Sequence, residues 1–353
     1  MQTILAIESS CDETAAAVVR GGNEVLSSVI YSQVPLHQPY GGVVPEIASR
    51  SHIEKIRSIV EQALAEAFPG EADPWSRIDA IAATRGPGLA ASLLVGWSAA
   101  KGLALAAGKP LLPIHHIHAH LHSVYLDQPL PPQPDDYPQL ALAVSGGHTC
   151  ILAAKQPHAW KLLGQTIDDA AGEALDKAAK LLNLGYPGGP VIDKRAKVIP
   201  VAQRKTIPFP QGRLTEDHPL PPGLSADLCL SFSGLKTSLL TYVQKHPPQN
   251  DADIDQICAC YQEAVVDALV KRLDKALQRN TYKTLAVGGG VSLNSRLRER
   301  LATLAQKHQV KLLLASPKYC GDNAAMIAGL AAVGGAHACE NALALDIDPS
   351  MEL

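Results

Sequence analysis

The length, composition and charge of the chain narrow the classes of protein to which it can belong. Its 353 residues, 46% hydrophobic and 18% charged, are enough for two globular domains with their own cores. A net charge of −3 argues against a free-standing nucleic-acid binder, which usually has a basic excess, so any RNA contact must be local or shared with a partner. Two small basic clusters are interpreted as solvated helix faces: Lys194, Arg195 and Lys197, and Arg296, Arg298 and Arg300.

Cysteine usage and the apolar segments bear on the location of the protein. The seven cysteines are scattered and odd in number, which is typical of free thiols in a reducing compartment. Residues 1–8 lack the basic region of a signal peptide, and the longest apolar run, residues 89–100, is too short to span a bilayer. We therefore expect a soluble cytoplasmic protein with no membrane partner.

The first part of the chain reads as a strand meander followed by alternating helices and strands. The predicted elements are strands at 3–7, 15–19 and 24–30, a helix at 53–68, a strand at 78–84, a helix from about 89 to 107 and a strand at 110–114. A stretch with five prolines, residues 126–138, then predicts a loop or hinge.

A similar pattern restarts after this hinge. The predicted elements are strands at 139–144 and 150–154, a helix at 167–184, a proline-rich loop at about 200–225, a helix at 254–278, a strand at 284–287, a helix from 295, a strand at 310–315 and a helix at 323–334. Because a strand–polar turn–strand unit occurs twice, we expect two domains with the same α/β plan.

Five histidines occupy eight consecutive positions, which is the least expected feature of the sequence. Imidazole is the commonest protein ligand for transition metals, and two histidines four apart share one face of a helix. His116 and His120 have this spacing, as do His118 and His122, and a strand would align all four, so the register stays open. Pro113 suits the first turn of a helix, which favours a helical metal site over solvated or core histidines.

The residues between these histidines bear on the kind of chemistry. A zinc-protease helix carries a glutamate beside its first histidine, whereas Ile117, His118 and Ala119 separate His116 from His120. This favours a metal that holds a ligand over one that activates water for peptide hydrolysis. A metalloprotease is nevertheless kept as an alternative.

Three turns rich in glycine, serine or threonine follow apolar strands, after Ile7, Val144 and Val287. Such turns present backbone N–H groups to an anion, and glycine allows a phosphate to approach closely. Each turn alone is ordinary turn chemistry. Three of them in two domains predict a nucleotide cleft between the domains.

Several acidic residues near these turns are candidates for function. Asp12 and Glu13 lie in the first turn, and Asp322 could complete a metal site with two histidines or could be the N-cap of the next helix. Asp176 reads otherwise as a solvated helix residue and Asp193 as a turn residue.

Eight motifs that follow one another along nearly the whole chain resemble a known family. They are IESSCDET at 7–14, YGGVVPEIASR at 40–50, the histidines at 115–120, VSGGHT at 144–149, DAAGEA at 169–174, YPGGP at 186–190, SFSGLKT at 231–237 and GGGVS at 288–292. Together they resemble the bacterial tRNA N6-adenosine threonylcarbamoyltransferase family, formerly labelled as glycoproteases.

The resemblance implies both a fold and a reaction. The fold would be two similar ribonuclease-H-like lobes of the actin/Hsp70/hexokinase ATPase superfamily with an interlobe nucleotide cleft, residues 1–137 with 326–353 forming one lobe and 138–325 the other. The reaction would move a threonylcarbamoyl group from threonylcarbamoyl-AMP to N6 of the adenosine 3′-adjacent to the tRNA anticodon. The implied partners are an inactive paralogous subunit and a P-loop ATPase subunit. A small-molecule kinase on the same fold stays an alternative, because fold does not fix function.

The resemblance also implies site residues. One divalent ion, Fe²⁺ or Zn²⁺, would be held by His116, His120 and Asp322, while His118 and His122 would be bystanders. The substrate-binding positions would be Ala143, Val144, Ser145, Gly146, Gly147, Asp176, Gly189, Asp193 and Asn294. No residue identifies itself as the general base, and only Asp12 and Glu13 are candidates.

Overall fold

The computed structural model describes residues 1–353 except 213, 215–219, 338 and 340. The chain divides into two compact units, each described here by itself. Unit 1 comprises Met1–Gln133 and Ala315–Leu353, and unit 2 comprises Pro134–Leu314. The C-terminal part of the chain therefore returns to the first unit and brings Asp322 with it.

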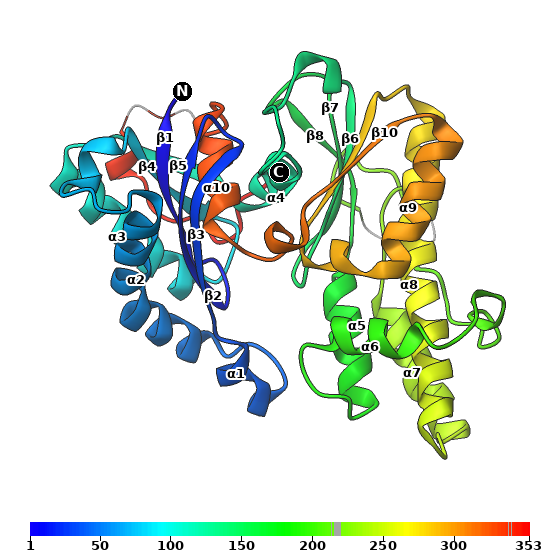
Figure 1. Ribbon diagram of the computed structural model, residues 1–353. Coiled ribbons are helices and arrows are strands. Elements are labelled where there is room, and N and C mark those ends of the chain that lie inside the picture. The colour runs from blue at the N-terminus through cyan, green and yellow to red at the C-terminus, as the bar shows by residue number, and fades with distance from the viewer. Residues whose placement is uncertain (213, 215–219, 338, 340) are drawn as a thin grey trace. The chain divides into compact units, whose positions relative to one another are not determined.

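Unit 1 is a five-stranded sheet with helices on both faces (Figure 1). Its elements are β1 (Thr3–Glu8), β2 (Glu13–Arg20), β3 (Glu24–Ser32), α1 (Val34–His37), α2 (Pro45–Ala67), β4 (Ala80–Gly86), α3 (Ala90–Ala107), β5 (Leu111–His115), α4 (His116–His122) and α10 (Ala324–Ala332). The strand order is β3-β2-β1-β4-β5, in which β1, β4 and β5 pair in parallel and β2 pairs antiparallel with both β1 and β3.

Strand β1 is the middle strand of this sheet, and all six of its residues are buried. Side chains alternate between the faces of a strand, so Ile4 and Ala6 join the core under α10, while Leu5 and Ile7 join the core under α2 and α3. A near-continuous apolar run is the pattern expected of a strand that is covered on both faces. The chain can therefore place polar side chains only at the ends of β1.

Unit 2 is built on a second five-stranded sheet. Its elements are β6 (Gln139–Val144), β7 (Thr149–Ala154), β8 (Trp160–Gln165), α5 (Ala171–Leu181), α6 (Gly188–Ala196), α7 (Ser233–Lys245), α8 (Asp251–Arg279), β9 (Thr284–Gly288), α9 (Ser295–His308) and β10 (Lys311–Leu314). The order β8-β7-β6-β9-β10, with β6, β9 and β10 parallel, repeats the order of unit 1 strand for strand. The predicted duplication of one α/β plan is confirmed.

Several predicted boundaries were wrong. Helix α2 begins at Pro45 and not at 53, and Pro113 lies in edge strand β5, not in the first turn of a helix. Strand β8 and helices α6 and α7 were not predicted. The sequence GGP at the start of α6 reads as a helix stop, but proline is tolerated in a first turn, where backbone N–H groups have no intrahelical acceptor. Residues 213 and 215–219 of the predicted loop lie outside the described residues.

Helix α3 extends beyond the apolar run 89–100, which by itself is too short to span a bilayer. Among the described residues it is the one helix long and apolar enough to cross a membrane, with a mean hydropathy of 1.4 over 18 residues, because it continues to Ala107. Core helices meet the same criterion, and here Trp97, Ala100 and Ala104 are buried in the core shared with α2. The helix is therefore weak evidence for a membrane span.

Candidate functional site

The carboxyl ends of the three parallel strands of unit 1 lie at one edge of the sheet. Strand β1 ends at Glu8, β4 at Gly86 and β5 at His115. No residue separates β5 from α4, and the His115 side chain caps the helix by accepting a hydrogen bond from the Ile117 N–H at 3.1 Å. The first turn of α4 therefore starts directly at this edge, where ligands commonly bind in α/β sheets.

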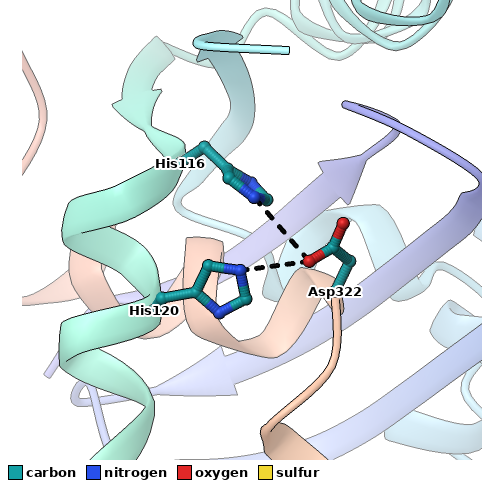
Figure 2. A group of neighbouring side chains, drawn as sticks. All are labelled: His116, His120 and Asp322. Carbon is teal, nitrogen blue, oxygen red and sulfur yellow. Dashed lines mark hydrogen bonds and ion pairs between the residues drawn. The ribbon is translucent and has the colours of Figure 1, made fainter. Parts of the chain in front are cut away.

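Two histidines of α4 and one aspartate converge at this place (Figure 2). His116 Nε2 lies 3.7 Å and His120 Nε2 3.0 Å from Asp322 Oδ1, and one potential ligand atom from each residue lies within 4.8 Å of the others. Ligand atoms of a tetrahedral zinc site with bonds of about 2.0–2.1 Å are about 3.3 Å apart, which these two distances bracket. The donor set of two imidazoles and one carboxylate can therefore hold one divalent ion, with coordination positions left for a ligand.

Asp322 is not the N-cap that the sequence allowed. Asn323 caps α10, because its side chain accepts a hydrogen bond from the Met326 N–H at 3.0 Å. The same side chain donates to the Gly321 carbonyl at 2.8 Å and so holds the turn around Asp322. The helix cap and the candidate metal ligand are thus neighbouring residues.

The pKa values of the neighbouring residues His115 and His116 are shifted in opposite directions. Burial lowers the pKa of His116, but Glu8 and Asp322 outweigh it and raise that pKa to about 9. Burial, with the neighbouring His118 and His116 rings, lowers the pKa of His115 to about 2. His116 therefore lies in a site that favours a positive charge, whereas His115 is held neutral as a helix cap.

Glu8 is a polar partner that the sequence reasoning missed. It is fully buried, and its Oε2 lies 3.1 Å from His116 Nδ1 and accepts a hydrogen bond from Thr84 Oγ1 at 2.5 Å. Its Oε1 accepts from the Ser10 N–H at 2.5 Å. The signal was present in the sequence, because an acidic residue directly follows an apolar strand.

The two other predicted histidines have different surroundings. His122 Nε2 lies 2.7 Å from the Gly22 carbonyl, and the His118 ring stacks on His115 with centroids 4.3 Å apart. Neither belongs to a metal-binding group among the residues that the structure describes. The fold selects the His116 and His120 pair from the register that the sequence left open.

A buried histidine holds the turn that carries Asp12 and leads into Glu13, the first residue of β2. His52 of α2 lies with its Nε2 3.0 Å from the Cys11 carbonyl and its Nδ1 2.8 Å from Thr14 Oγ1. Burial lowers the pKa of His52, so the ring is neutral and can donate on one side and accept on the other.

Burial, then Asp12 and Asp322, raise the pKa of Glu13 well above its ordinary value. A carboxyl group of this kind can exchange a proton nearer to neutral pH.

We expect Glu13→Gln to raise the melting temperature of the metal-free protein at neutral and alkaline pH. Because the folded state raises the pKa of Glu13, the contribution of this residue to stability is fully present below the unfolded value of about 4.3 and is lost as pH rises through the folded value. The difference between variant and parent should therefore shrink toward acid pH. Thermal melts from pH 4 to 9 in the presence of a chelator measure it, and a variant that is less stable than the parent at pH 8 would contradict the expectation.

The predicted substrate loop of unit 2 lies at the corresponding edge of its sheet. Ala143 and Val144 are buried in β6, and residues 145–147 follow its carboxyl end. The Gly172 and Glu173 N–H groups donate to the carbonyls of residues 145 and 146, so α5 begins under this loop. At position 172 a Cβ would lie 2.6 Å from the Ser145 carbonyl oxygen, and only glycine allows this approach.

The four remaining predicted substrate residues lie in or beside the helices of unit 2, and three of them hold backbone or side-chain groups. Asp176 accepts from the Gly188 N–H at 2.7 Å, next to Gly189. Asp193 lies in α6 and accepts from Ser295 Oγ at 2.8 Å, so it is not a turn residue. Asn294 caps α9 and donates to Gln262 Oε1 at 2.8 Å. Asp176 is likewise more than a solvated helix residue.

The interpretation of Arg296 as a solvated residue was wrong. Its side chain is buried and donates to both carboxylate oxygens of Glu263, at 2.7 and 2.9 Å. Arg300 donates to Glu263 and to Asp267 at 2.8 and 2.7 Å. The run of Arg296, Arg298 and Arg300 suggests a solvated face, but α9 packs on α8.

The sequence is similar to a family of curated proteins over most of its length. A model of the family described as tRNA N6-adenosine threonylcarbamoyltransferase matches residues 24–329. A protein of that name from Geobacter sp. (strain M21) is 49% identical over 92% of this chain and 89% of its own length. Another from Trichlorobacter lovleyi is 48% identical over 97% and 94%.

Solved structures similar to this chain establish its fold. Full-length HypF in a phosphate- and nucleotide-bound form has a TM-score of 0.58 at 13% identity, over 95% of this chain and 46% of that one. The Acidaminococcus fermentans (R)-2-hydroxyglutaryl-CoA dehydratase component A has a TM-score of 0.51 at 14% identity, over 94% and 97%. The predicted α/β fold of two similar lobes is thus confirmed, while the cleft between the units stays a prediction.

Proposed function

This chain belongs to the tRNA N6-adenosine threonylcarbamoyltransferase family, and on that premise we propose its donor, its target position and its metal site. As a member of the family it is a transferase, and tRNA is its substrate. The proposed donor is threonylcarbamoyl-AMP. The proposed acceptor is N6 of the adenosine 3′-adjacent to the anticodon, in tRNAs that read codons beginning with A.

The observation that carries the proposal is the convergence of His116, His120 and Asp322 on one point in unit 1. These residues would hold one divalent ion, Fe²⁺ or Zn²⁺ being favoured over Mg²⁺ by two imidazole ligands. When bound, the ion would act as a Lewis acid on the donor carbonyl or phosphate. The zinc-protease glutamate is absent from this helix, which supports a ligand-holding ion over one that activates water for proteolysis.

The proposed reaction is acyl transfer to an amine. The N6 nitrogen forms a bond to the carbamoyl carbon, the bond from that carbon to the phosphate oxygen breaks, and AMP leaves with the electron pair. The amine must lose one proton. Glu13 is the proposed acceptor because its pKa is raised, and Asp12 is the alternative.

We propose that the loops of unit 2 take part in donor binding. The space beside Gly146 and Gly147 is open, so a phosphate could approach their backbone N–H groups. Asp176 and Asp193 hold the N–H of Gly188 and the hydroxyl of Ser295, and they would also accept hydrogen bonds from ribose or adenine. Ala143, Val144, Gly189 and Asn294 complete this proposed set.

The net charge of −3 supports a partner that helps to hold the tRNA. By the resemblance, we propose an inactive paralogous subunit and a P-loop ATPase subunit. The protein is proposed to work in the cytoplasm.

The test combines the purified protein with unmodified tRNA, threonylcarbamoyl-AMP and the partner proteins. Digestion of the tRNA and nucleoside analysis should detect threonylcarbamoyladenosine, which should fall when a chelator removes the metal and return with Fe²⁺ or Zn²⁺. Modification that is unchanged after verified metal removal would refute the role of the metal. Absence of product with every partner and metal present would refute the proposed donor.

A further inference from the structure

Glu8 is the one carboxylate for which the described contacts include a hydrogen bond to the far side of a candidate metal ligand. Its Oε2 lies 3.1 Å from Nδ1 of His116, the ring nitrogen that does not face Asp322. Neither oxygen depends on solvent, because Glu8 is fully buried and accepts hydrogen bonds from Thr84 and from the Ser10 backbone. Three separate elements thus fix this carboxylate: β1, the turn after β1, and β4.

This arrangement determines which His116 nitrogen carries the proton. A carboxylate only accepts hydrogen bonds, so the nitrogen that faces it keeps its hydrogen, and when the ring gives up its second proton the lone pair is left on Nε2. We propose that Glu8 is a positioning residue for the candidate metal centre, because it fixes the tautomer and the ring orientation of His116 so that Nε2 is presented to the cation. This inference rests on the proposed metal site but assigns a residue beyond it.

His120 provides an internal contrast. Its Nδ1 is buried and has no hydrogen-bond partner among the residues that the structure describes. Packing within α4 and the contact with Asp322 therefore orient His120 without a carboxylate behind the ring. The two histidine ligands are held unequally, so a change at Glu8 should act through His116.

An amide cannot replace the Glu8 carboxylate without a conflict. If the oxygen of the introduced amide faces His116 and Thr84, its NH₂ group meets the Ser10 N–H, and two donors oppose each other. If the amide turns over, the NH₂ group faces His116 Nδ1, which must then accept, and the hydrogen moves to Nε2. A ring protonated at Nε2 cannot bind a metal through that atom.

The test compares Glu8→Gln with the parent protein and with Asp127→Asn. The control makes the same carboxylate-to-amide change in unit 1. There Asp127 accepts a hydrogen bond from the Tyr319 hydroxyl at 2.8 Å and contacts no candidate metal ligand. Competition with a chromogenic chelator gives the Zn²⁺ affinity, and Co²⁺ absorption reports the ligand field. We expect Glu8→Gln to lose about 10–100-fold in Zn²⁺ affinity and to change the Co²⁺ spectrum, while the control keeps both. A folded Glu8→Gln protein with the affinity and spectrum of the parent would overturn the inference.

A second measurement on the parent protein does not depend on the folding of any variant. Long-range ¹H–¹⁵N correlation spectra of the Zn²⁺-loaded protein, with His116→Gln used for assignment, show which ring nitrogen carries hydrogen. A protonated Nδ1 on His116 supports the inference, and a metal-bound Nδ1 contradicts it. Failure of the parent to bind Zn²⁺, Fe²⁺ or Co²⁺ would instead refute the metal site itself, so the two failures are distinguishable.

Discussion

His116→Ala is expected to abolish metal uptake and threonylcarbamoyl transfer together. The substitution leaves His120 and Asp322, and two protein ligands hold a divalent ion much less well than three. Loss of a Lewis acid that supplies several kcal/mol of charge stabilisation should lower the transfer rate about 100-fold or more. Metal content by mass spectrometry and nucleoside analysis of the tRNA measure the two effects on the same preparation.

The matched control for this prediction is His118→Ala. His118 lies on the same helix, but its ring stacks on His115 and does not belong to the metal-binding group. The His118→Ala protein should therefore keep its metal. Full transfer by a metal-free His116→Ala protein would show that the reaction does not need the proposed ion.

Of the substitutions that we predict, Glu263→Ala is expected to lower the free energy of unfolding the most. The substitution leaves the buried Arg296 guanidinium without the carboxylate that binds it through two hydrogen bonds, and Arg300 loses one of its two partners. Removal of one member of a buried ion pair typically costs about 3–5 kcal/mol, because the remaining charge stays desolvated. Urea unfolding followed by circular dichroism should show the loss in the transition of unit 2.

Glu299→Ala tests whether burial is the cause. Glu299 also pairs with Arg296, at 2.8 Å, but 59% of its side chain is exposed. An exposed pair contributes about 0–1 kcal/mol, so this variant should unfold close to the parent. Equal losses in the two variants would mean that the charge of Arg296, and not its burial, sets the cost.

The sequence predicted the strands of both sheets more reliably than their helices. Strands β1, β6 and β9 are continuous apolar runs that end in polar or glycine-rich turns, and this pattern is local. Helices α6 and α7 were missed because glycine, proline and serine at their starts resemble loops. Their positions are set by packing on α8 and α5, which no local pattern reports.

The sequence by itself predicted a metal-binding helix. Five histidines within eight residues and the four-residue spacing of His116 and His120 are local facts, and so is the acidic end of β1 at Glu8. The motifs also placed the chain in its family without any coordinates.

Only the tertiary structure decided how these parts combine. Asp322 lies 202 residues beyond His120 and reaches it because α10 packs on the sheet of unit 1, and Glu8 reaches His116 across 108 residues because β1 and β5 end at the same edge. Contacts over such separations follow from which apolar faces bury each other, and the identity of the polar residues at the edge does not encode that choice. The sequence therefore supplied the ligand types, and burial of the sheet selected which of them meet.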